Sequence, residues 1–346
     1  MVTRLKSTAL IILLSLLCLT GWSQQTFTNP LLSSGADPWS IYYNGFYYYT
    51  NTLGDSIVIW KTKSIANLRH AERTTVFVPP SGTSYSKELW APEIHLINNK
   101  WYIYFAADNG NNNNHRLYVL MNTSNDPMSG QWIFKGKISD RSDRWAIDGS
   151  VFSFRHQRYM IWSGWEGNTN GSQDIYIAKM RSPTKIKGRR HRISTAIYDW
   201  EKFGDLNDVN NPPHVNVNEG PQSLQHNKKL FIIYSASGCW TDQYSLGMLT
   251  YSGKGKVTDS SQWHKSIKQV FNQSVDNKVF APGHNSFFKS PDGKEDWILY
   301  HANDNAGEGC GRHRSPRAQP FSWNGDGTPY FGVPVEIEQQ MKVPGE

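Results

Sequence analysis

Five times along the chain, a polar residue beside Pro or Gly precedes a segment of alternating apolar and polar positions, a turn, and an aromatic-rich segment. The five copies are GADPW before SIYYNGFYYYT, WAPE before IHLINNKWYIYFA, AIDG before SVFSFRHQRYMIWSG, NEGP before QSLQHNKKLFIIYSASG, and FAPGH before NSFFKSPDGKEDWILYHA. Alternation with a period of two is the pattern of a β-strand, and a short polar step between two such segments indicates a hairpin. The chain is therefore expected to be built from β-hairpins.

The polar step in each copy gives the expected position of the hairpin turn. These turns are predicted at Asn44-Gly45, Asn98-Asn99, His156-Gln157, His226-Asn227 and 291–293. Asn-Gly is the strongest of these signals, because both residues readily adopt the positive φ of a two-residue hairpin turn.

The repeat predicts the fold class. The leading residues of the copies, at positions 37, 93, 148, 219 and 284, lie 55 to 71 residues apart, which is enough for a four-stranded sheet and its loops. Five such sheets placed radially form an all-β, five-bladed β-propeller, which protects its strand edges by repetition. A two-sheet sandwich also has many short strands, but it does not require the same signature five times. Because the innermost strands of a propeller start at one mouth, the leading residues should gather in one pocket.

The composition agrees with this fold. Of the 346 residues, 38% are hydrophobic and 19% charged, which excludes a disordered chain and a membrane bundle. The 28 Gly and 17 Pro favour many short elements. Aromatic residues reach 13%, more than a core of this size should need, and such a surplus suits sheet surfaces and sugar-binding clefts.

Residues 1–23 have the pattern of a signal peptide. Arg4 and Lys6 precede an apolar run at 9–19, and small residues occur at 21 and 23. We therefore expect a mature chain of 24–346, a single catalytic domain that is secreted or periplasmic, without a membrane anchor, and monomeric.

The formal net charge is +7, and the densest basic run is KIKGRRHR at 185–192. Such a run is more often a solvated segment than a polyanion site, and it lacks interleaved aromatics and any nucleic-acid motif. No nucleic-acid partner is expected, and attraction to an acidic polysaccharide is the lesser alternative. Cys239 and Cys310 remain in the mature chain, either as a disulfide, which export would favour, or as two buried thiols.

Three of the leading residues are acids: Asp37, Asp148 and Glu219. Each lies beside Pro or Gly, and any one of them alone would fit an ordinary turn. Three acids leading three copies of the repeat indicate a carboxylate cluster instead. Glycoside hydrolysis needs such a cluster, because one acid protonates the leaving oxygen and one base activates water.

The segments GADPW, WAIDGSVF, NEGPQSL, PGHNSFF and RSPRAQPFSWNGDGTPYFG resemble the motifs of glycoside hydrolase family 43, in the family's order and across the mature chain. The resemblance implies a five-bladed propeller that hydrolyses furanosides or xylosides with inversion. It implies that Asp37 is the general base, Glu219 the general acid, and Asp148 the carboxylate that raises the pKa of the acid and orients it. Inversion requires the base and acid to be roughly 6.5–9.5 Å apart.

The resemblance also implies roles around the three acids. His284 should lie on the axis beside a structural, hydrated Ca²⁺, the alternative being a neutral histidine bonded to backbone groups; no organic cofactor is expected. Arg317 should bind the sugar or a catalytic carboxylate, the alternative being a surface salt bridge. Further substrate contacts are expected from three tryptophans, for each of which core packing is the alternative, and from a supporting acid: Trp39, Trp90, Trp165 and Glu93.

The substrate expectation rests on motifs, length and loops. With WAPE in the second copy, HA after the fifth and too few residues for a C-terminal sandwich domain, the chain most resembles single-domain, exo-acting α-L-arabinofuranosidases that act on plant cell-wall arabinan. Long inserts at 167–173, 204–217 and 304–316 could wall a pocket, whereas an endo-arabinanase needs an open cleft. A β-xylosidase, a β-galactofuranosidase and an endo-arabinanase remain alternatives within the family. A non-catalytic sugar-binding propeller is the alternative from another class, and loss of any of the three acids would favour it.

Overall fold

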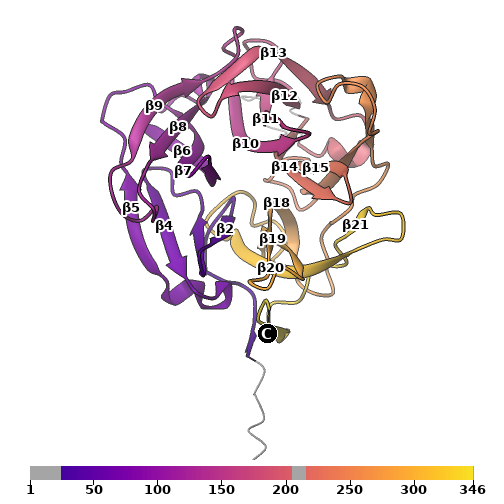
Figure 1. The fold of residues 1–346 in the computed structure, drawn as a ribbon. Helices are drawn as coiled ribbons and strands as arrows, with labels where there is room; N and C mark the ends of the chain where they lie inside the picture. Colours follow the sequence, from indigo (N-terminus) through magenta and orange to yellow (C-terminus); the bar gives the residue numbers. More distant parts are fainter. Residues whose placement is uncertain (1–24, 205–215, 346) are drawn as a thin grey trace, which may run out of the picture.

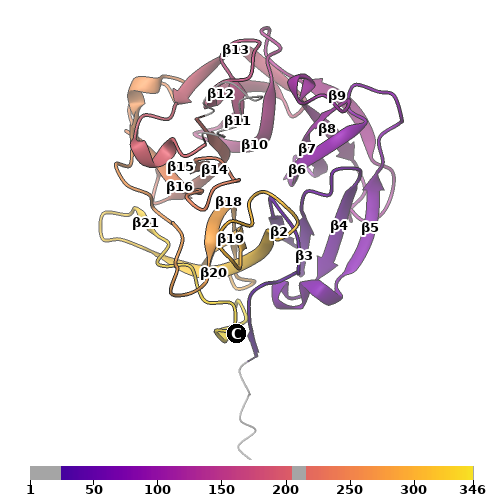
Figure 2. The same ribbon diagram turned by 180° about the vertical axis from the view of Figure 1, so that it is seen from behind.

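The computed structural model describes residues 25–204 and 216–345, and the predicted signal peptide lies outside these residues. Five four-stranded antiparallel sheets stand around a central axis as the blades of a propeller (Figures 1 and 2), which confirms the predicted fold. None of the helices in the described residues is long and apolar enough to cross a membrane.

Each blade is formed by four strands that are consecutive in sequence. Blade 1 contains β2 (Trp39–Tyr43), β3 (Phe46–Thr50), β4 (Ile57–Thr62) and β5 (Glu72–Phe77). Blade 2 contains β6 (Lys87–Ile97), β7 (Lys100–Asp108), β8 (Arg116–Asn122) and β9 (Ile133–Ile138). Blade 3 contains β10 (Ala146–Phe154), β11 (Gln157–Trp165), β12 (Gln173–Ser182) and β13 (Lys185–Ser194). Blade 4 contains β14 (Asn218–His226), β15 (Lys229–Ala236), β16 (Ser245–Tyr251) and β17 (Trp263–Lys265). Blade 5 contains β18 (Phe280–Lys289), β19 (Asp296–Asn303), β20 (Ser315–Trp323) and β21 (Pro329–Tyr330).

Short 3₁₀ helices lie in the connections, and a terminal strand pair closes the ring. The helices are η1 (Ile65–His70), η2 (Asn112–Asn114), η3 (Asp199–Glu201) and η4 (Ser260–Gln262). Near the C-terminus, β1 (Thr26–Phe27) pairs antiparallel with β22 (Met341–Lys342) beside blades 1 and 5 (Figure 1). The innermost strands β2, β6, β10, β14 and β18 each contact the next, and β18 contacts β2, so the first residues of all five blades meet at one end of the axis.

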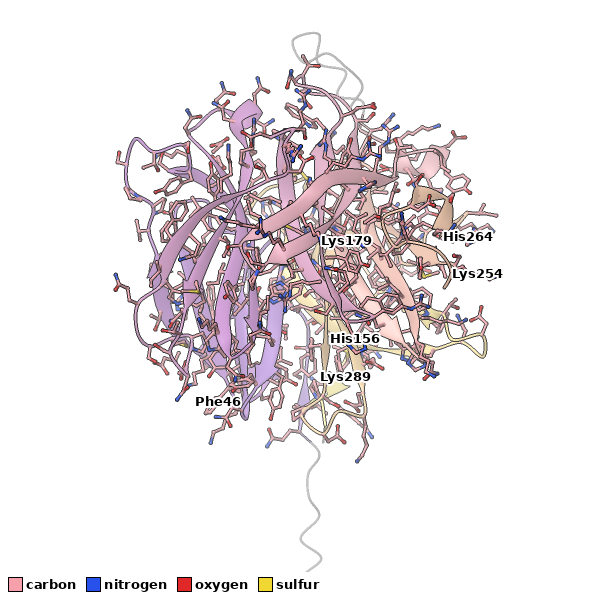
Figure 3. The ribbon with its side chains drawn as sticks, turned by 45° about the horizontal axis from the view of Figure 1, so that its top comes forward. Phe46, His156, Lys179, Lys254, His264 and Lys289 are labelled. Atoms are coloured by element: carbon pink, nitrogen blue, oxygen red, sulfur yellow. A yellow bond between two sulfur atoms is a disulfide. The ribbon has the colours of Figure 1, made fainter. Side chains whose placement is uncertain are left out.

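Two of the predicted turns between the first and second strands are confirmed, and two are shifted by one residue. Asn44-Gly45 and Asn98-Asn99 have positive φ at both positions, as a two-residue hairpin turn requires. In blades 3 and 4 the turns lie at Arg155-His156 and Asn227-Lys228. Arg155 and Lys228 have no preference for positive φ, so turn chemistry did not indicate this register. The turn in blade 5 spans 290–295 and includes the predicted residues. Figure 3 labels Phe46, His156 and Lys289, which lie in or beside these turns.

An irregularity repeats at the mouth end of every innermost strand. Two consecutive residues of the first strand oppose a single residue of the second, and in blade 1 the corresponding pair directly precedes β2. The first residue of each pair has a φ between 45° and 56°; these residues are Asp37, Ala91, Asp148, Gly220 and Ala281. This is the geometry of a β-bulge whose first residue is left-handed. A left-handed residue other than Gly costs roughly 1–2 kcal/mol, and Asp is among the residues that tolerate it best.

These bulge positions correct the repeat alignment made from the sequence. Asp37 and Asp148 are structurally equivalent, as predicted. Glu219 is not their equivalent, because it precedes the bulge residue Gly220 by one position. Pro or Gly follows the bulge residue in every blade, so an alignment on these residues would have placed Gly220 at the position of Asp37 and Asp148.

Five buried apolar clusters fill the interfaces between neighbouring blades. Both faces of a blade's second strand are buried in them: in β3, Tyr47 and Tyr49 pack against blade 5, and Tyr48 packs against blade 2. This explains the unbroken aromatic runs of the second strands. The interpretation of the aromatics as a surplus beyond the core is therefore wrong for these strands, because five inter-blade interfaces need many large side chains.

Candidate active site

A cavity of about 460 Å³ opens at the mouth end of the axis, lined by residues from all five blades. Asp37, Asp148 and Glu219 all line it, although they belong to blades 1, 3 and 4. The predicted convergence of the three acids is confirmed.

Asp37 is held in its ionised form. The hydroxyl of Thr52 donates to Oδ2 at 2.5 Å, and the Nδ1 atom of His284 and the Nη1 atom of Arg314 lie 3.5 and 3.7 Å from Oδ1. Burial alone would raise the pKa of Asp37, but His284, Arg314 and the Thr52 hydrogen bond outweigh it and lower the pKa to about 2. The Asp37 backbone N–H also donates to Nδ1 of His301 at 3.0 Å, which fixes the bulge.

Asp148 and Glu219 show the opposite behaviour. Burial is the largest cause and raises the pKa of each carboxyl to about 8, and a neighbouring carboxylate adds to the rise. For Glu219 that neighbour is Asp148. The expected effect of Asp148 is therefore present, but it ranks second to desolvation.

Each of these carboxyls also accepts one hydrogen bond that favours its ionised form. The Gly220 N–H donates to Oδ2 of Asp148 at 2.9 Å, and the Tyr244 hydroxyl donates to Oε1 of Glu219 at 2.8 Å. Burial and the neighbouring carboxylates outweigh both bonds, so the pKa of each carboxyl stays raised.

Two glycines make these approaches possible. A Cβ on Gly283 would lie 2.1 Å from the Tyr244 ring, so only glycine lets Tyr244 reach Glu219. Gly220 has a φ of 55°, and a Cβ there would lie 3.1 Å from the His284 ring. The His284 ring is thus packed between the Gly220 backbone and Asp37.

Aromatic rings form one wall of the cavity. Trp90 and Trp165 line it as predicted, and Trp145, which the sequence reasoning missed, lines it between them. Trp145 and Trp165 stack with centroids 4.6 Å apart, and Trp90 stacks on His115 at 4.0 Å. Flat C–H faces of a sugar pack well on such surfaces.

Three expected substrate contacts do not line the cavity, so these predictions are wrong. The indole N–H of Trp39 donates to the carbonyl of Ile94, which turns the ring into the interface between blades 1 and 2. Glu93 is buried and bonded to Gln222 and His95, and it acts on the site only through its charge, which raises the pKa of Asp148.

Arg317 is the third incorrect contact. Its side chain is completely buried in β20, where it bonds to Asp304 and Ser315, and it does not line the cavity. The arginine that lines the cavity is Arg314, three residues earlier in the preceding loop.

The sequence held a usable signal for only one of the missed residues. The Asn44-Gly45 turn pairs Trp39 with Thr50, so the same register continued outward brings Thr52 next to Asp37. The bulge at Asp37 shifts the pairing by one residue, and the Thr52 N–H donates to the carbonyl of Ala36. Arg314 and Tyr244 lie at the ends of long loops, whose paths the strand pattern does not determine.

The comparisons with known proteins agree with this geometry. The family profile described as "Glycosyl hydrolases family 43" matches residues 27–329. The chain belongs to this family.

Among curated relatives, the family 43 chain is 36% identical over 321 residues to the "Extracellular exo-alpha-(1->5)-L-arabinofuranosidase" of Streptomyces avermitilis, covering 90% of this chain. It spans 64% of that relative's length. A protein with the same description from Streptomyces chartreusis is 34% identical over 281 residues, covering 80% of this chain and 82% of its own. The crystal structure of an α-L-arabinofuranosidase from Lactobacillus brevis superposes with a TM-score of 0.82 at 34% identity, covering 90% of this chain and 98% of the other.

The calcium expected in this family 43 chain has no direct ligand set. Within residues 25–204 and 216–345, no three His, Cys, Asp or Glu side chains gather so as to hold a metal. Beside His284, however, both amide atoms of Asn285 are buried without a protein partner. Buried polar atoms of this kind normally bond to ordered water. The residues around His284 therefore fit an ion only if it is held through its own water molecules.

A disulfide joins Cys239 and Cys310, whose Cα atoms are 5.2 Å apart, which decides between the two states left open by the sequence. It links the loop 237–244 of blade 4 to the loop 304–314 of blade 5, and both cysteines line the cavity. The same loops supply Trp240 and Arg314 to the cavity wall.

Replacing both cysteines with Ser should raise KM several-fold with a smaller change in kcat, because Trp240 and Arg314 would no longer be fixed. The free energy of unfolding should fall by about 2–4 kcal/mol. Steady-state kinetics and thermal unfolding of the double variant measure both effects. An unchanged KM in a folded double variant would show that the disulfide stabilises the fold without shaping the cavity.

Proposed function

We propose that this family 43 protein is an exo-acting α-L-arabinofuranosidase that releases terminal arabinofuranose from α-1,5-linked arabinan and arabino-oligosaccharides of plant cell walls. The observation that carries the proposal is the opposite displacement of two carboxyl pKa values in one cavity, downward at Asp37 and upward at Glu219. A general base and a general acid that act together need this difference. The descriptions of the relatives from Streptomyces support the sugar and the linkage.

In the proposed reaction, Asp37 accepts a proton from a water molecule as that water attacks the anomeric carbon. Glu219 gives its proton to the glycosidic oxygen as the C–O bond breaks, so the products are arabinose and a shortened oligosaccharide. Burial and the charge of Asp148 keep Glu219 protonated, and His284 and Arg314 keep Asp37 ionised. One displacement by water inverts the anomeric configuration.

The exo mode is supported by loops that wall the cavity. Asn170 comes from the connection between β11 and β12, and Cys310 and Arg314 come from the connection after β19. A walled cavity accepts a chain end better than the middle of a polymer.

Product analysis on linear and branched arabinan tests the proposal. We expect arabinose as the sole early product, with the inverted anomer visible by NMR in the first minutes. Three aryl glycosides should be compared: the α-L-arabinofuranoside, the β-xyloside and the β-galactofuranoside. The α-L-arabinofuranoside should be hydrolysed fastest. A ladder of oligomers would indicate endo action, and binding without turnover would indicate a sugar-binding propeller.

We also propose that the protein is exported and acts as a monomer. The signal-peptide pattern of residues 1–23 supports export, and two relatives are described as extracellular. Size-exclusion chromatography with light scattering, and N-terminal sequencing of the exported protein, test both statements.

The rate should depend on pH through the two displaced groups. The value of kcat/KM should rise as Asp37 ionises near pH 2 and fall as Glu219 loses its proton near pH 8. In Asp148→Asn the alkaline limb should move to lower pH, because the like charge that helps keep Glu219 protonated is gone. An alkaline limb that does not move in this variant would contradict the role of Asp148.

The same groups make stability depend on pH. The folded pKa of Glu219 is above its unfolded value of 4.5, so its proton stabilises the folded state below pH 4.5, and this contribution is lost as the pH rises through about 8. Thermal unfolding should therefore show a Tm that falls between pH 5 and 9, with a smaller fall in Glu219→Gln.

We propose finally that a hydrated Ca²⁺ binds beside His284 and Asn285, where it would supply positive charge near the carboxylates. Removal of the ion by EDTA should lower the Tm, and Ca²⁺ should restore it, because a ligand at 100 times its Kd stabilises a fold by about 2.7 kcal/mol. The same Tm before and after EDTA, in protein shown by elemental analysis to be metal-free, would refute this ion.

A further inference from the structure

A buried ion pair lies behind the wall of the cavity and takes no part in the proposed reaction. Glu201, at the end of η3, is fully buried, and the Lys265 side chain, at the end of β17, is 9% exposed. Their Nζ and Oε1 atoms are 2.5 Å apart. Such a pair loses hydration on burial and is often no more stable than apolar residues of the same size. Its presence in blade 4 therefore calls for a role other than stability.

Both oxygens of Glu201 are fully used. Oε2 accepts the backbone N–H groups of Ile197 and Tyr198 at 2.9 and 3.0 Å. Oε1 accepts the side-chain amide of Asn218 and the hydroxyl of Tyr234, both at 3.0 Å. The carboxylate thus ties the connection between blades 3 and 4 to the first strand of blade 4.

Lys265 bonds the same asparagine side chain of β14. Besides Glu201, its ammonium donates to the carbonyl of Thr195 at 2.6 Å and to Oδ1 of Asn218 at 3.2 Å. Lys265 and Glu201 therefore bond to the same side chain, that of Asn218.

Asn218 is where all these contacts converge. Its Oδ1 also accepts the hydroxyl of Ser194 at 2.7 Å, and its backbone carbonyl accepts the hydroxyl of Ser163 at 3.0 Å. It is fully buried and directly precedes Glu219. Since successive side chains of a strand point to opposite faces, the network grips the back of β14 while Glu219 faces the cavity.

We propose that Glu201, Lys265 and Asn218 form a clamp that positions Glu219 for proton donation. This inference rests on the proposed role of Glu219 as the acid. The three are positioning residues, because none of them lines the cavity. The hydroxyl of the buried Tyr244 donates to the Glu219 carboxyl, and the clamp holds the backbone beside it, so Glu219 is held at both ends. A displacement of about 1 Å at a catalytic group can cost about 100-fold in rate, so a rigid anchor of this kind has a direct effect on the chemistry.

The test compares two leaving groups. An arabino-oligosaccharide needs its leaving oxygen protonated, whereas dinitrophenolate departs without a proton. A misplaced acid should therefore lower kcat on the oligosaccharide at least about 10-fold more than on dinitrophenyl arabinofuranoside, with little change in KM. The variants are Glu201→Gln, Lys265→Met, Asn218→Ala and the double variant Glu201→Gln/Lys265→Met. The double variant leaves no unpaired buried charge and is expected to fold even if a single variant does not.

Asn29→Ala provides the matched control. Asn29 is also buried and bonds both backbone groups of Ala318, each at 3.0 Å, but it lies outside the cavity lining and pairs with blade 5. Asn29→Ala should lower the Tm without changing the ratio of kcat on the oligosaccharide to kcat on dinitrophenyl arabinofuranoside. An unchanged ratio in the folded double variant, or an equal change in Asn29→Ala, would overturn the clamp.

Glu219→Gln, measured in parallel, separates this inference from the proposed function. If Glu219→Gln lowers the ratio and the clamp variants do not, the clamp alone is refuted. If Glu219→Gln leaves the ratio unchanged, Glu219 is not the acid, and the clamp proposal is overturned together with that role.

Discussion

Asp37→Asn is expected to lower kcat about 10³- to 10⁴-fold on every substrate, because each turnover needs an activated water whatever the leaving group. The variant should fold normally. Asn tolerates a φ of 56° as well as Asp does, and its amide oxygen can still accept the bond from Thr52. Steady-state kinetics on an arabino-oligosaccharide and on dinitrophenyl arabinofuranoside, with the Tm, measure the effect.

Asp292→Asn is the control for this prediction. Asp292 also has a pKa lowered to about 2, caused by bonds from Ser290 and Lys294, but it lies in the surface turn between β18 and β19. Its replacement should leave kcat unchanged. A loss in Asp37→Asn of less than tenfold, or one confined to the oligosaccharide, would remove Asp37 from the role of base.

Glu219→Gln is expected to lower kcat on the oligosaccharide about 10²- to 10⁴-fold and to have a much smaller effect on dinitrophenyl arabinofuranoside. In the residual activity on the oligosaccharide, the alkaline limb of the rate profile should disappear, because the group that titrates there is gone. The glutamine oxygen can keep the contact with Tyr244, so the cavity should retain its shape.

Glu72→Gln, on the exposed outer strand β5, should leave both rates unchanged. Equal losses on both substrates in Glu219→Gln would indicate that Glu219 binds the sugar and does not donate the proton.

Most of the fold could be predicted from the sequence, because a propeller repeats its signals. The Asn44-Gly45 turn and the alternation around it recur in modified form in each blade, and five weak signals at similar spacing are stronger than one. The exact register was less accessible. Asn227 and His156 tolerate a left-handed conformation, but Arg155 and Lys228 have no preference for it. These two residues are left-handed because the strands on both sides are already paired.

In the site, the residues on the innermost strands were predictable, and those on loops or on buried faces were not. Asp37, Asp148 and Glu219 are fixed by the ring geometry, which brings every first strand to the same mouth. Arg314 and Arg317 differ by three positions, and only the path of the loop after β19 decides which of them reaches the cavity. The motif around an arginine does not contain that information.

The left-handed bulge has a consequence for how new chemistry could arise on this scaffold. The ring has five equivalent bulge positions around its axis. Two of them hold aspartate, and the other three hold Ala91, Gly220 and Ala281. The fold holds the backbone of each bulge position in the left-handed conformation, whichever side chain is present. An ancestor could therefore have moved, gained or lost an acid by single substitutions without rebuilding a loop. The variants Ala91→Asp and Ala281→Asp would show whether the bulge positions without an acid can carry one in a folded protein.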